Sequence, residues 1–164
     1  MATPTYTALA TITLSSSASS VTFSNIGSGF RDLRLVFNGK ISGDFEAPVT
    51  LNSDSSGNYY AVNMRGDGSS YASSTNTGAT HFQLGLRNVT IANTDEIIST
   101  IDFLDSSATD KHKTILKRVG AASKQTYAEA VRWASTSAVT TISMSVAGGS
   151  YLTGSTFSLF GIEA

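Results

Sequence analysis

Apolar and polar residues alternate with a period of two along most of this chain, from a first run at Tyr6–Leu14 to a last run at Gly154–Ile162. Successive side chains of a β-strand point to opposite faces of a sheet, so each run indicates a strand with one face on a core. The other runs lie at 21–23, 32–37, 47–51, 59–64, 81–87, 96–104, 113–119, 127–133 and 139–146. About nine to eleven strands separated by turn residues predict an all-β protein, an antiparallel β-sandwich that is jelly-roll-like.

Turn-forming residues predict how some of these strands are connected. Asn38 and Gly39 suit a two-residue hairpin turn. The segment Asn52–Asn58 consists almost wholly of turn-forming residues, and we expect the strands on its two sides to pair as neighbours. Arg65–Thr80 combines glycines with many Ser and Thr residues and shows no alternation, which predicts a long loop.

Three runs carry further expectations. In the first run the even-numbered residues from Tyr6 to Leu14 share one face, and Leu9 is the exception to the pattern. The run 96–104 has apolar residues at both parities, which predicts a central strand covered on both faces. The alanines of Gln125–Ala134 favour a helix, but its aromatic residues and the lack of capping residues favour a strand.

Composition limits the classes of protein that the chain can represent. Its 164 residues are enough to bury the hydrophobic core of one domain. We expect a single domain over 1–164 with a short N-terminal arm. Charged residues make up only 14%, and 26 Ser and 21 Thr supply much of the polar surface. A net charge of -1 disfavours nucleic-acid or membrane binding through general basicity. The chain has no cysteine, no stretch of about 18 apolar residues and no signal-like start, so we expect a soluble protein.

Residues that could carry chemistry are few, and we predict no enzyme activity, no cofactor and no metal. His81 and His112 are the only histidines, and neither has a partner at catalytic or ligand spacing. The loop residues Asn52, Asp54 and Asn58 offer oxygen atoms that Ca²⁺ accepts, but only one of them is a carboxylate, so calcium is the weaker interpretation. The acidic run of Asp102, Asp105 and Asp110 fits a solvated connection better than the paired carboxylates of a glycosidase.

Two further groups of side chains have alternative interpretations. Lys111, Lys113, Lys117 and Arg118 form the only basic cluster, which we place on the solvent face of an edge strand, where it blocks aggregation. The alternative is contact with phosphate or an acidic surface. Aromatic residues suit stacking on sugar rings, and the candidates are Trp133, Tyr59, Tyr60 and Tyr71. We expect Trp133 in the core and Tyr71 exposed.

Three pairs of segments give the chain a family resemblance. They are Val21–Ile26 with Asp32–Val36, Leu51–Tyr59 with Arg65–Ser69, and Trp133–Ile142 with Gly154–Ile162. On these segments the chain resembles small virion proteins of tailed bacteriophages, especially phages of cyanobacterial and other marine hosts. The resemblance implies a β-sandwich component of the phage particle, either a capsid cement or decoration protein or a tail-associated module. The alternative function in this family is a tail or fibre module that binds host-surface carbohydrate.

Because the chain carries no coiled coil or collagen-like stalk, we expect a decoration protein that binds across joints between capsid subunits and stabilises the shell. The partners expected from the resemblance are the major capsid protein of the same particle and further copies of this chain, as a homotrimer at local threefold positions. Its location would be the virion, after synthesis in the host cytoplasm. The residues expected to contact partners lie in the N-terminal arm and in two loops: Thr3, Pro4, Tyr6, Asn52, Asp54, Asn58, Arg65, Asp67 and Tyr71.

Overall fold

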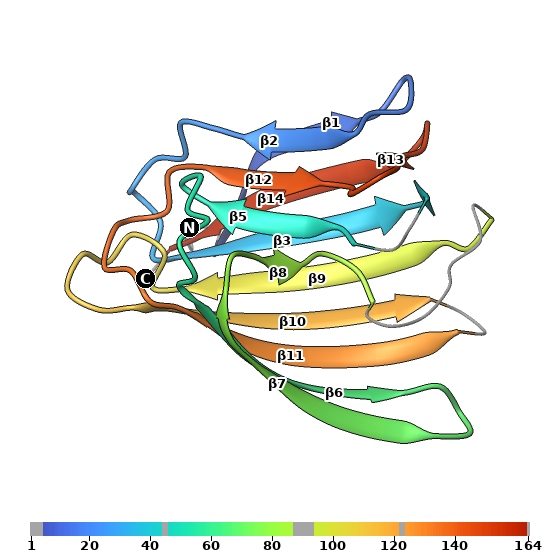
Figure 1. Ribbon diagram of the computed structural model, residues 1–164. Helices are drawn as coiled ribbons and strands as arrows, with labels where there is room; N and C mark the ends of the chain where they lie inside the picture. The colour runs from blue at the N-terminus through green and yellow to red at the C-terminus, as the bar shows by residue number, and fades with distance from the viewer. Residues whose placement is uncertain (1–4, 44–45, 87–93, 122–123, 164) are drawn as a thin grey trace.

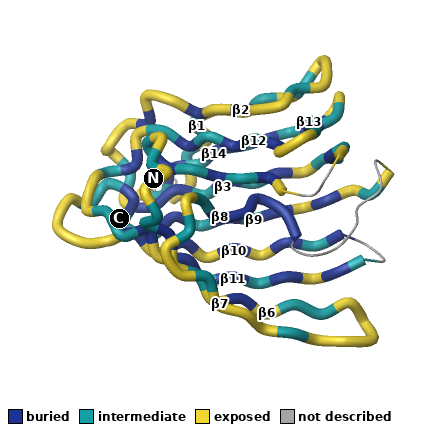
Figure 2. Tube along the Cα trace, in the orientation of Figure 1, coloured by how far each residue is buried: buried dark blue, intermediate teal, exposed yellow. Residues whose placement is uncertain are grey.

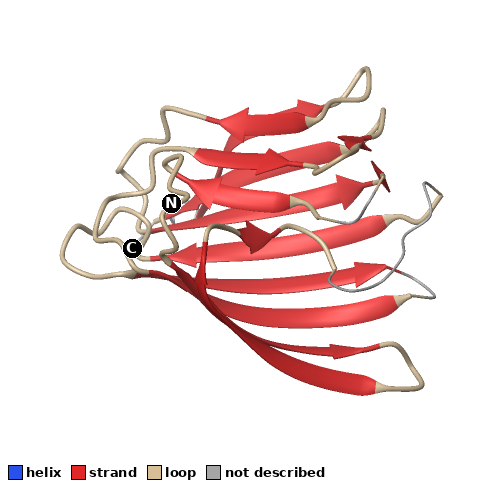
Figure 3. Ribbon diagram, in the orientation of Figure 1, coloured by secondary structure: helices blue, strands red, loops and turns tan. Residues whose placement is uncertain are grey.

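Strands are the only regular elements in the computed structural model, which describes residues 5–43, 46–86, 94–121 and 124–163 (Figure 3). In chain order the strands are β1 (Tyr6–Thr13), β2 (Ser20–Phe23), β3 (Asp32–Gly39), β4 (Ile41–Ser42), β5 (Pro48–Leu51), β6 (Tyr59–Gly66), β7 (Tyr71–Ala79), β8 (Phe82–Gln83), β9 (Ile97–Leu104), β10 (Lys113–Ala121), β11 (Gln125–Trp133), β12 (Ile142–Ser145), β13 (Ser150–Tyr151) and β14 (Thr156–Ile162). Over the described residues, no helix is long and apolar enough to cross a membrane. The predicted all-β class is confirmed.

The strands form two stacked antiparallel sheets. The larger sheet has eight strands in the order β1-β14-β3-β9-β10-β11-β6-β7, and the smaller has four in the order β2-β12-β5-β8. A two-stranded pair, β13-β4, lies beside them. Figure 1 shows the smaller sheet lying across one face of the larger one, while β6 and β7 extend beyond it. This arrangement is the predicted β-sandwich.

The strand order identifies the sandwich as a jelly roll. Its eight principal strands form the sets β1-β14-β3-β9 and β2-β12-β5-β8. Along the chain they alternate between the two sheets except at β5 and β8, which both belong to the smaller sheet, and this is the order of a jelly roll. The hairpin β6–β7 is inserted between β5 and β8, and the hairpin β10–β11 is inserted between β9 and β12. Both hairpins add to the β9 side of the larger sheet, which therefore becomes twice as wide as the smaller one.

The core lies between the two sheets and follows the alternation of the sequence. Leu33, Leu35 and Phe37 of β3 are buried, as are Phe157 and Leu159 of the neighbouring β14. Figure 2 shows the resulting alternation of buried and less buried positions along the larger sheet. The rings of Phe37 and Phe157 lie 4.9 Å apart between centroids. Such aromatic pairs add about 0.5–1.5 kcal/mol to the free energy of area burial.

A β-bulge at Leu9 corrects the expectation for the first strand. The pairing of β1 with β14 shifts between Ala8 and Ala10, so Leu9 is an extra residue in the ladder. Ala8 lies opposite Phe160 and Ala10 lies opposite Leu159, which point to opposite faces of β14. The even-numbered residues of this run therefore do not share one face. The exception in the sequence pattern marked the bulge.

The predicted hairpin at Asn38 and Gly39 is wrong. The next strand after β3 is β4, which pairs with β13, and neither residue has the positive φ that the predicted turn requires. Gly39 instead permits a close approach of Ser155, because a Cβ at this position would overlap the Ser155 side chain. The glycine serves packing between neighbouring segments.

Two predictions around β6 are also wrong. The strands on the two sides of 52–58 do not pair, because β5 belongs to the smaller sheet and β6 to the larger. The segment from Arg65 to Thr80 is mostly β7, which pairs with β6 in a hairpin. No residue of β7 is buried, so no apolar alternation marks it in the sequence.

The last two predictions for single runs have different outcomes. The strand β9 is central in its sheet, but only one face is covered, because Ile98 is 55% exposed. The expectation of two covered faces is therefore wrong. The strand prediction for 125–134 is confirmed by β11, which lies between β10 and β6.

Candidate functional site

The face of the eight-stranded sheet that points away from the smaller sheet is not covered by another layer of the described chain, and we call it the outer face (Figure 1). Partners in antiparallel strands share a face, so the strand register assigns residues to it. One row across the sheet contains Met64, Ala128, Arg118, Thr100 and Val36. Every exposed large hydrophobic residue of the described chain maps to this face. These residues are Tyr6, Tyr60, Val62, Met64, Tyr71, Ile98 and Leu116.

The apolar part of the outer face is widest over β10, β11 and β6. A shallow depression of about 450 Å³ lies there. Its apolar lining residues are Val62, Met64, Leu116, Ala128 and Ala130. Val62 is 52% exposed and Met64 is 66% exposed, although apolar side chains of this size gain free energy when they leave water. Contiguous apolar surface of this kind is typical of sites that bind another macromolecule.

Two arginines on the outer face, Arg34 and Arg132, contact neighbouring side chains. Arg34 of β3 makes two hydrogen bonds with Asp102 of β9, from Nε to Oδ1 at 2.5 Å and from Nη2 to Oδ2 at 3.0 Å. The hydrogen bond with Asp102 raises the pKa of Arg34 above its ordinary value, although partial burial opposes this. The guanidinium of Arg132 lies 4.5 Å from the ring centroid of Tyr60. Arg34 is likewise 5.4 Å from the ring centroid of Tyr6, so cations and aromatic rings are combined on this face.

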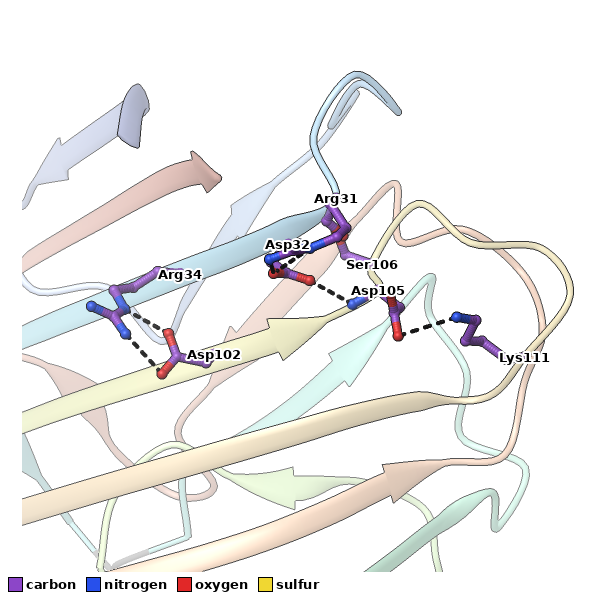
Figure 4. Close-up of polar contacts among 7 residues, drawn as sticks. All are labelled: Arg31, Asp32, Arg34, Asp102, Asp105, Ser106 and Lys111. Atoms are coloured by element: carbon purple, nitrogen blue, oxygen red, sulfur yellow. Dashed lines mark hydrogen bonds and ion pairs between the residues drawn. The ribbon is translucent and has the colours of Figure 1, made fainter. Parts of the chain in front are cut away.

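Two carboxylates of the acidic run, those of Asp102 and Asp105, are partners of basic groups (Figure 4). Asp102 lies within β9, so the expectation that it belongs to a solvated connection is wrong. Asp102 binds Arg34, and Asp105 lies 3.5 Å from the amine of Lys111. The backbone N–H of Asp105 donates to Oδ1 of Asp32 at 2.7 Å, and Oδ2 of Asp32 accepts from Arg31. These contacts tie the start of β3 to the end of β9. They account for Asp102 and Asp105 as structural groups.

The predicted contact residues of the N-terminal arm are only partly described. Thr3 and Pro4 lie outside the described residues. Tyr6 is the first residue of β1, is 47% exposed and lies on the outer face opposite Ile162 of β14. Tyr6 therefore belongs to the same uncovered surface as Met64 and Leu116, although it lies on an opposite part of the sheet.

The loop residues Asn52 and Asp54 have structural hydrogen bonds. Oδ1 of Asn52 accepts from the backbone N–H of Thr140 at 2.8 Å and of Thr141 at 3.0 Å. Oδ2 of Asp54 accepts from Nε1 of the buried Trp133 at 2.6 Å and from the amide of Asn58 at 2.9 Å. These contacts occupy oxygen atoms that the calcium interpretation assigned to a metal. Across the described ranges, no group of three or more His, Asp or Glu side chains is placed to hold a metal ion.

Hydrogen bonds also explain the ionisation of Asp54. Partial burial acts to raise its pKa, but hydrogen bonds from Asn58, Trp133 and Ser56 outweigh this, and the net pKa lies below the ordinary value. The same loop holds Tyr59, whose hydroxyl accepts from the backbone N–H of Leu51 at 2.8 Å. Burial raises the pKa of Tyr59 to about 12. The loop is therefore a well-bonded crossover between the two sheets.

The remaining predicted contact residues lie at the turn of the β6–β7 hairpin. Oδ1 of Asp67 accepts from the backbone N–H of Ser69 at 2.9 Å and of Ser70 at 2.6 Å. These hydrogen bonds, with those from the two serine hydroxyls, lower the pKa of Asp67 well below its ordinary value. Tyr71 begins β7 and is 94% exposed, as predicted. Arg65 is on the neighbouring strand, directly opposite Ala72.

The two predicted contact loops do not form one site. Loop 52–58 precedes β6 and the hairpin turn follows it, so the length of β6 separates them by about 23 Å. The outer-face residues Val62 and Met64 lie between them on β6, and sequence reasoning did not select either. A signal for them was present, because the run 59–64 has apolar residues at both parities. The same applies to Leu116 in the run 113–119.

The basic cluster is not on one solvent face, and β10 is not an edge strand. The side chains of Lys113 and Lys117 point between the sheets and are buried, whereas Arg118 lies on the outer face. Desolvation by burial lowers the pKa of Lys113. Adjacent residues of a strand face opposite ways, so a run of neighbouring cations is divided between the two faces.

Lys117 is part of a buried polar network. Its amine lies 2.8 Å from Oε2 of Glu129 on β11, and both side chains are 0% exposed. The amine also donates to the backbone carbonyl oxygens of Gln83 at 2.7 Å and Gly85 at 3.3 Å. The hydroxyl of Tyr127 donates to Oε1 of Glu129 at 2.9 Å. The network therefore fixes the chain around β8 onto the inner face of the larger sheet.

The aromatic candidates separate clearly. Trp133 and Tyr59 are buried, which confirms the core prediction for Trp133. Tyr60 and Tyr71 are exposed on the outer face and remain available to a ligand. His81 contacts Thr80 and Gln83, and His112 is exposed.

Comparison of the chain with protein-family models, curated proteins and solved structures gives no match.

Proposed function

We propose that this protein is a structural component of a phage virion that acts by adhesion and performs no catalysis, and that it decorates the capsid. It attaches through the outer face of its eight-stranded sheet. The observation that supports this most strongly is the gathering of all the exposed large hydrophobic residues of the described chain on that one face. In this proposal the partner is the major capsid protein, and the location is the virion.

The kinds of residue on the outer face support adhesion to a protein surface. Aromatic residues, Met and Arg are enriched in protein interfaces, and Tyr60, Met64, Arg118 and Arg132 lie together on adjacent strands. The pairing of Arg132 with Tyr60 holds both side chains in place before binding, which reduces the entropy lost on association. Jelly rolls serve as capsid and lectin domains, so the fold is compatible with the proposal and does not by itself choose a partner.

The energetic role of a decoration protein follows from mass action. A protein that binds the assembled shell and not its separate subunits shifts the equilibrium toward the shell. A stable interface buries about 800 Å² on each partner, and a wide flat sheet face can provide this area. The homotrimer at local threefold positions remains a prediction of the resemblance.

Co-sedimentation tests the proposal directly. Empty shells of the parent phage, assembled without this protein, are mixed with wild-type protein and with Ile98→Asp and Met64→Asp, which place a charge at two parts of the outer face. We expect each variant to bind at least about tenfold more weakly, because an unpaired charge is desolvated in the interface. Thr22→Asp on the exposed side of β2 is the matched control and should bind as wild type does.

Immunogold labelling of intact particles then gives the position, and we expect label on the shell. Label confined to the tail, or full shell binding by both outer-face variants, would contradict the proposal. Circular dichroism of each variant checks that the β-sheet spectrum is retained.

A carbohydrate-binding function is the second candidate, and Tyr71 is the observation in its favour. Its ring is 94% exposed beside a depression of about 480 Å³ that Arg65, Ser73 and Thr126 also line. Aromatic rings stack on the apolar faces of sugars, and hydroxyl and guanidinium groups bind sugar hydroxyls. A glycan array probed with wild type and Tyr71→Ala tests it, and the expected result is one glycan class whose signal is lost in the variant. An array without any signal would exclude this candidate.

A further inference from the structure

Among the edge strands of the two described sheets, β7 has the least of the usual protection against pairing with another chain. Edge strands are normally short, bulged, charged or interrupted by proline. At the edges of the smaller sheet, β2 has four residues and β8 has two. At the other edge of the larger sheet, β1 carries the bulge at Leu9 in its middle. In contrast, β7 has nine residues, no proline and no charged side chain, and its pairing is irregular only near its end, between Asn76 and Ala79.

The free side of β7 is regular enough to accept a new strand. Its pairing with β6 is continuous from Tyr71 to Asn76, and the irregularity lies beyond Asn76. The backbone hydrogen bonds of β7 within the described chain are those with β6. Groups on its other side therefore present a template of N–H donors and C=O acceptors for strand addition.

The strand also gains little from the fold of a single copy. None of its nine residues is buried, and Figure 2 shows the hairpin β6–β7 as intermediate or exposed over most of its length. Figure 1 shows that the hairpin extends beyond the smaller sheet. Its inner strand β6 buries Tyr59 and Asn63 and pairs with β11, so the lack of packing is confined to β7. A strand that packs on neither face and pairs on one edge only adds little stability in water. A further strand on its free edge would supply the missing contacts.

We propose that β7 pairs with β7 of a second copy of this chain in antiparallel fashion, which joins the two larger sheets into one continuous sheet. The segment Tyr71–Asn76 is uncharged, so it meets its own copy without electrostatic repulsion, whereas the usual protecting lysines would repel each other. A twofold axis makes such a contact self-complementary and closes the assembly at two copies. The dimer is an alternative to the homotrimer that the resemblance implies, and it does not depend on what the outer face binds.

The pairing has a consequence for the outer face. Antiparallel strands related by a twofold axis keep the same face of both sheets on the same side. The apolar outer-face residues nearest to the junction are Val62, Met64 and Tyr71, and in the dimer they would be continuous with their copies. The dimer would therefore present an adhesive face of double width.

Sedimentation velocity over about 1 to 300 µM tests the dimer, because a ladder of this length buries less than a standard interface and should dissociate in the micromolar range. We expect the mass to rise with concentration from 17.1 kDa toward twice that value. A mass that stays at 17.1 kDa over the whole range, or that rises to three times it, would overturn the inference.

Charge variants identify the contact. Ser73 and Thr75 lie opposite Met64 and Val62, so both point to the outer face. In Ser73→Lys/Thr75→Lys, like charges meet across the junction when the twofold axis passes near residues 73–75, the middle of the regular segment, and we expect at least about a tenfold rise in the dimer dissociation constant. The Ser73→Glu/Thr75→Glu variant should behave in the same way. An equimolar mixture of the two variants should recover the dimer, because opposite charges then face each other.

Thr11→Lys/Thr13→Lys is the matched control, since it makes the same change on the other edge strand of the sheet. It should dimerise as wild type does. Dimerisation that is unaffected by the lysines on β7, or lost with the control, would place the contact elsewhere. Shell binding by Ile98→Asp is measured separately, so failure of the dimer and failure of the proposed adhesion are distinguished.

Discussion

The buried pair of Lys117 and Glu129 gives the sharpest prediction about stability. Both side chains are 0% exposed and their charged atoms are 2.8 Å apart. Glu129→Gln keeps the shape of the side chain but removes the charge that compensates the lysine. Breaking a buried pair in this way costs about 3–5 kcal/mol, because the remaining charge is desolvated without a partner.

The cost is large relative to the total. A domain of this size has a free energy of unfolding of about 5–15 kcal/mol. A cost of about 4 kcal/mol against a total of about 10 kcal/mol removes more than a third of the stability. At about 2–4 °C per kcal/mol, the melting temperature would fall by roughly 6–20 °C. Urea denaturation at pH 7, followed by circular dichroism, measures the free energy directly.

A double-mutant cycle separates the pair from the other contacts of the lysine. In Lys117→Met the carbonyl oxygens of Gln83 and Gly85 lose a donor, so this variant is also destabilised. The double variant Lys117→Met/Glu129→Gln should lose less free energy of unfolding than the sum of the losses in the two single variants. The expected difference is about 2–4 kcal/mol, because neither charge is then left buried without its partner.

An exposed ion pair is the matched control for this cycle. Lys111 and Asp105 are 3.5 Å apart, with side chains 52% and 42% exposed. Lys111→Gln should cost less than about 1 kcal/mol, because water screens the pair. If Glu129→Gln costs no more than Lys111→Gln, the reasoning about desolvation is refuted.

Three other predictions follow from single contacts. Asp54→Asn should lower the melting temperature at pH 7 relative to wild type. This difference should shrink as the pH falls. A carboxyl with a lowered pKa contributes stability above its ordinary pKa of 3.8, and this contribution is lost as the pH falls through the pKa of the folded state. A difference that does not change with pH would contradict this role of Asp54. Tyr59 and Tyr151 should ionise later than the other tyrosines in a spectrophotometric titration, since burial raises the pKa of Tyr59 to about 12 and that of Tyr151 further. Because the folded state favours the neutral form of these two tyrosines, their contribution to the free energy of unfolding is intact below pH 10 and declines as the pH rises through about 12. Ionisation of all six tyrosines near pH 10 would contradict the burial of these two. Gly161→Ala should lower the free energy of unfolding by about 1–3 kcal/mol, because the new Cβ would overlap the ring of Phe30. Adding Phe30→Leu to this variant should recover part of the loss. Equal stability of wild type and Gly161→Ala in urea would show that the ring moves aside at no cost.

The strands that bury one face were predictable, and β7 was not. Leu33, Leu35 and Phe37 alternate with less buried residues because one face of β3 contacts the core. A strand such as β7, which buries neither face, has no reason to alternate, and its Ser and Thr residues resemble those of a loop. Its existence depends on the ladder with β6, which is a contact between strands.

The candidate site was predictable only in part. The prediction that Tyr71 is exposed is confirmed, and the choice of Tyr6 placed one residue on the outer face. Val62 and Met64 were missed, because apolar residues on a strand predict burial unless the number of covering layers is known. The wrong placement of Lys113 and Lys117 has the opposite cause, because lysine is rarely buried. Only tertiary contacts stabilise these two amines: Glu129 pairs with Lys117, and backbone carbonyl oxygens accept from Lys113.

The sequence by itself determined that this protein is built of half-buried strands, because alternation with a period of two is a local consequence of strand geometry. It also limited the charge available at the surface. Only the tertiary structure decided which strands pair, which of the two sheets each one joins and which face of the larger sheet stays uncovered. Backbone hydrogen bonds between strands are nearly independent of side-chain identity, so the strand order is chosen by the packing of the whole core, which no single segment encodes.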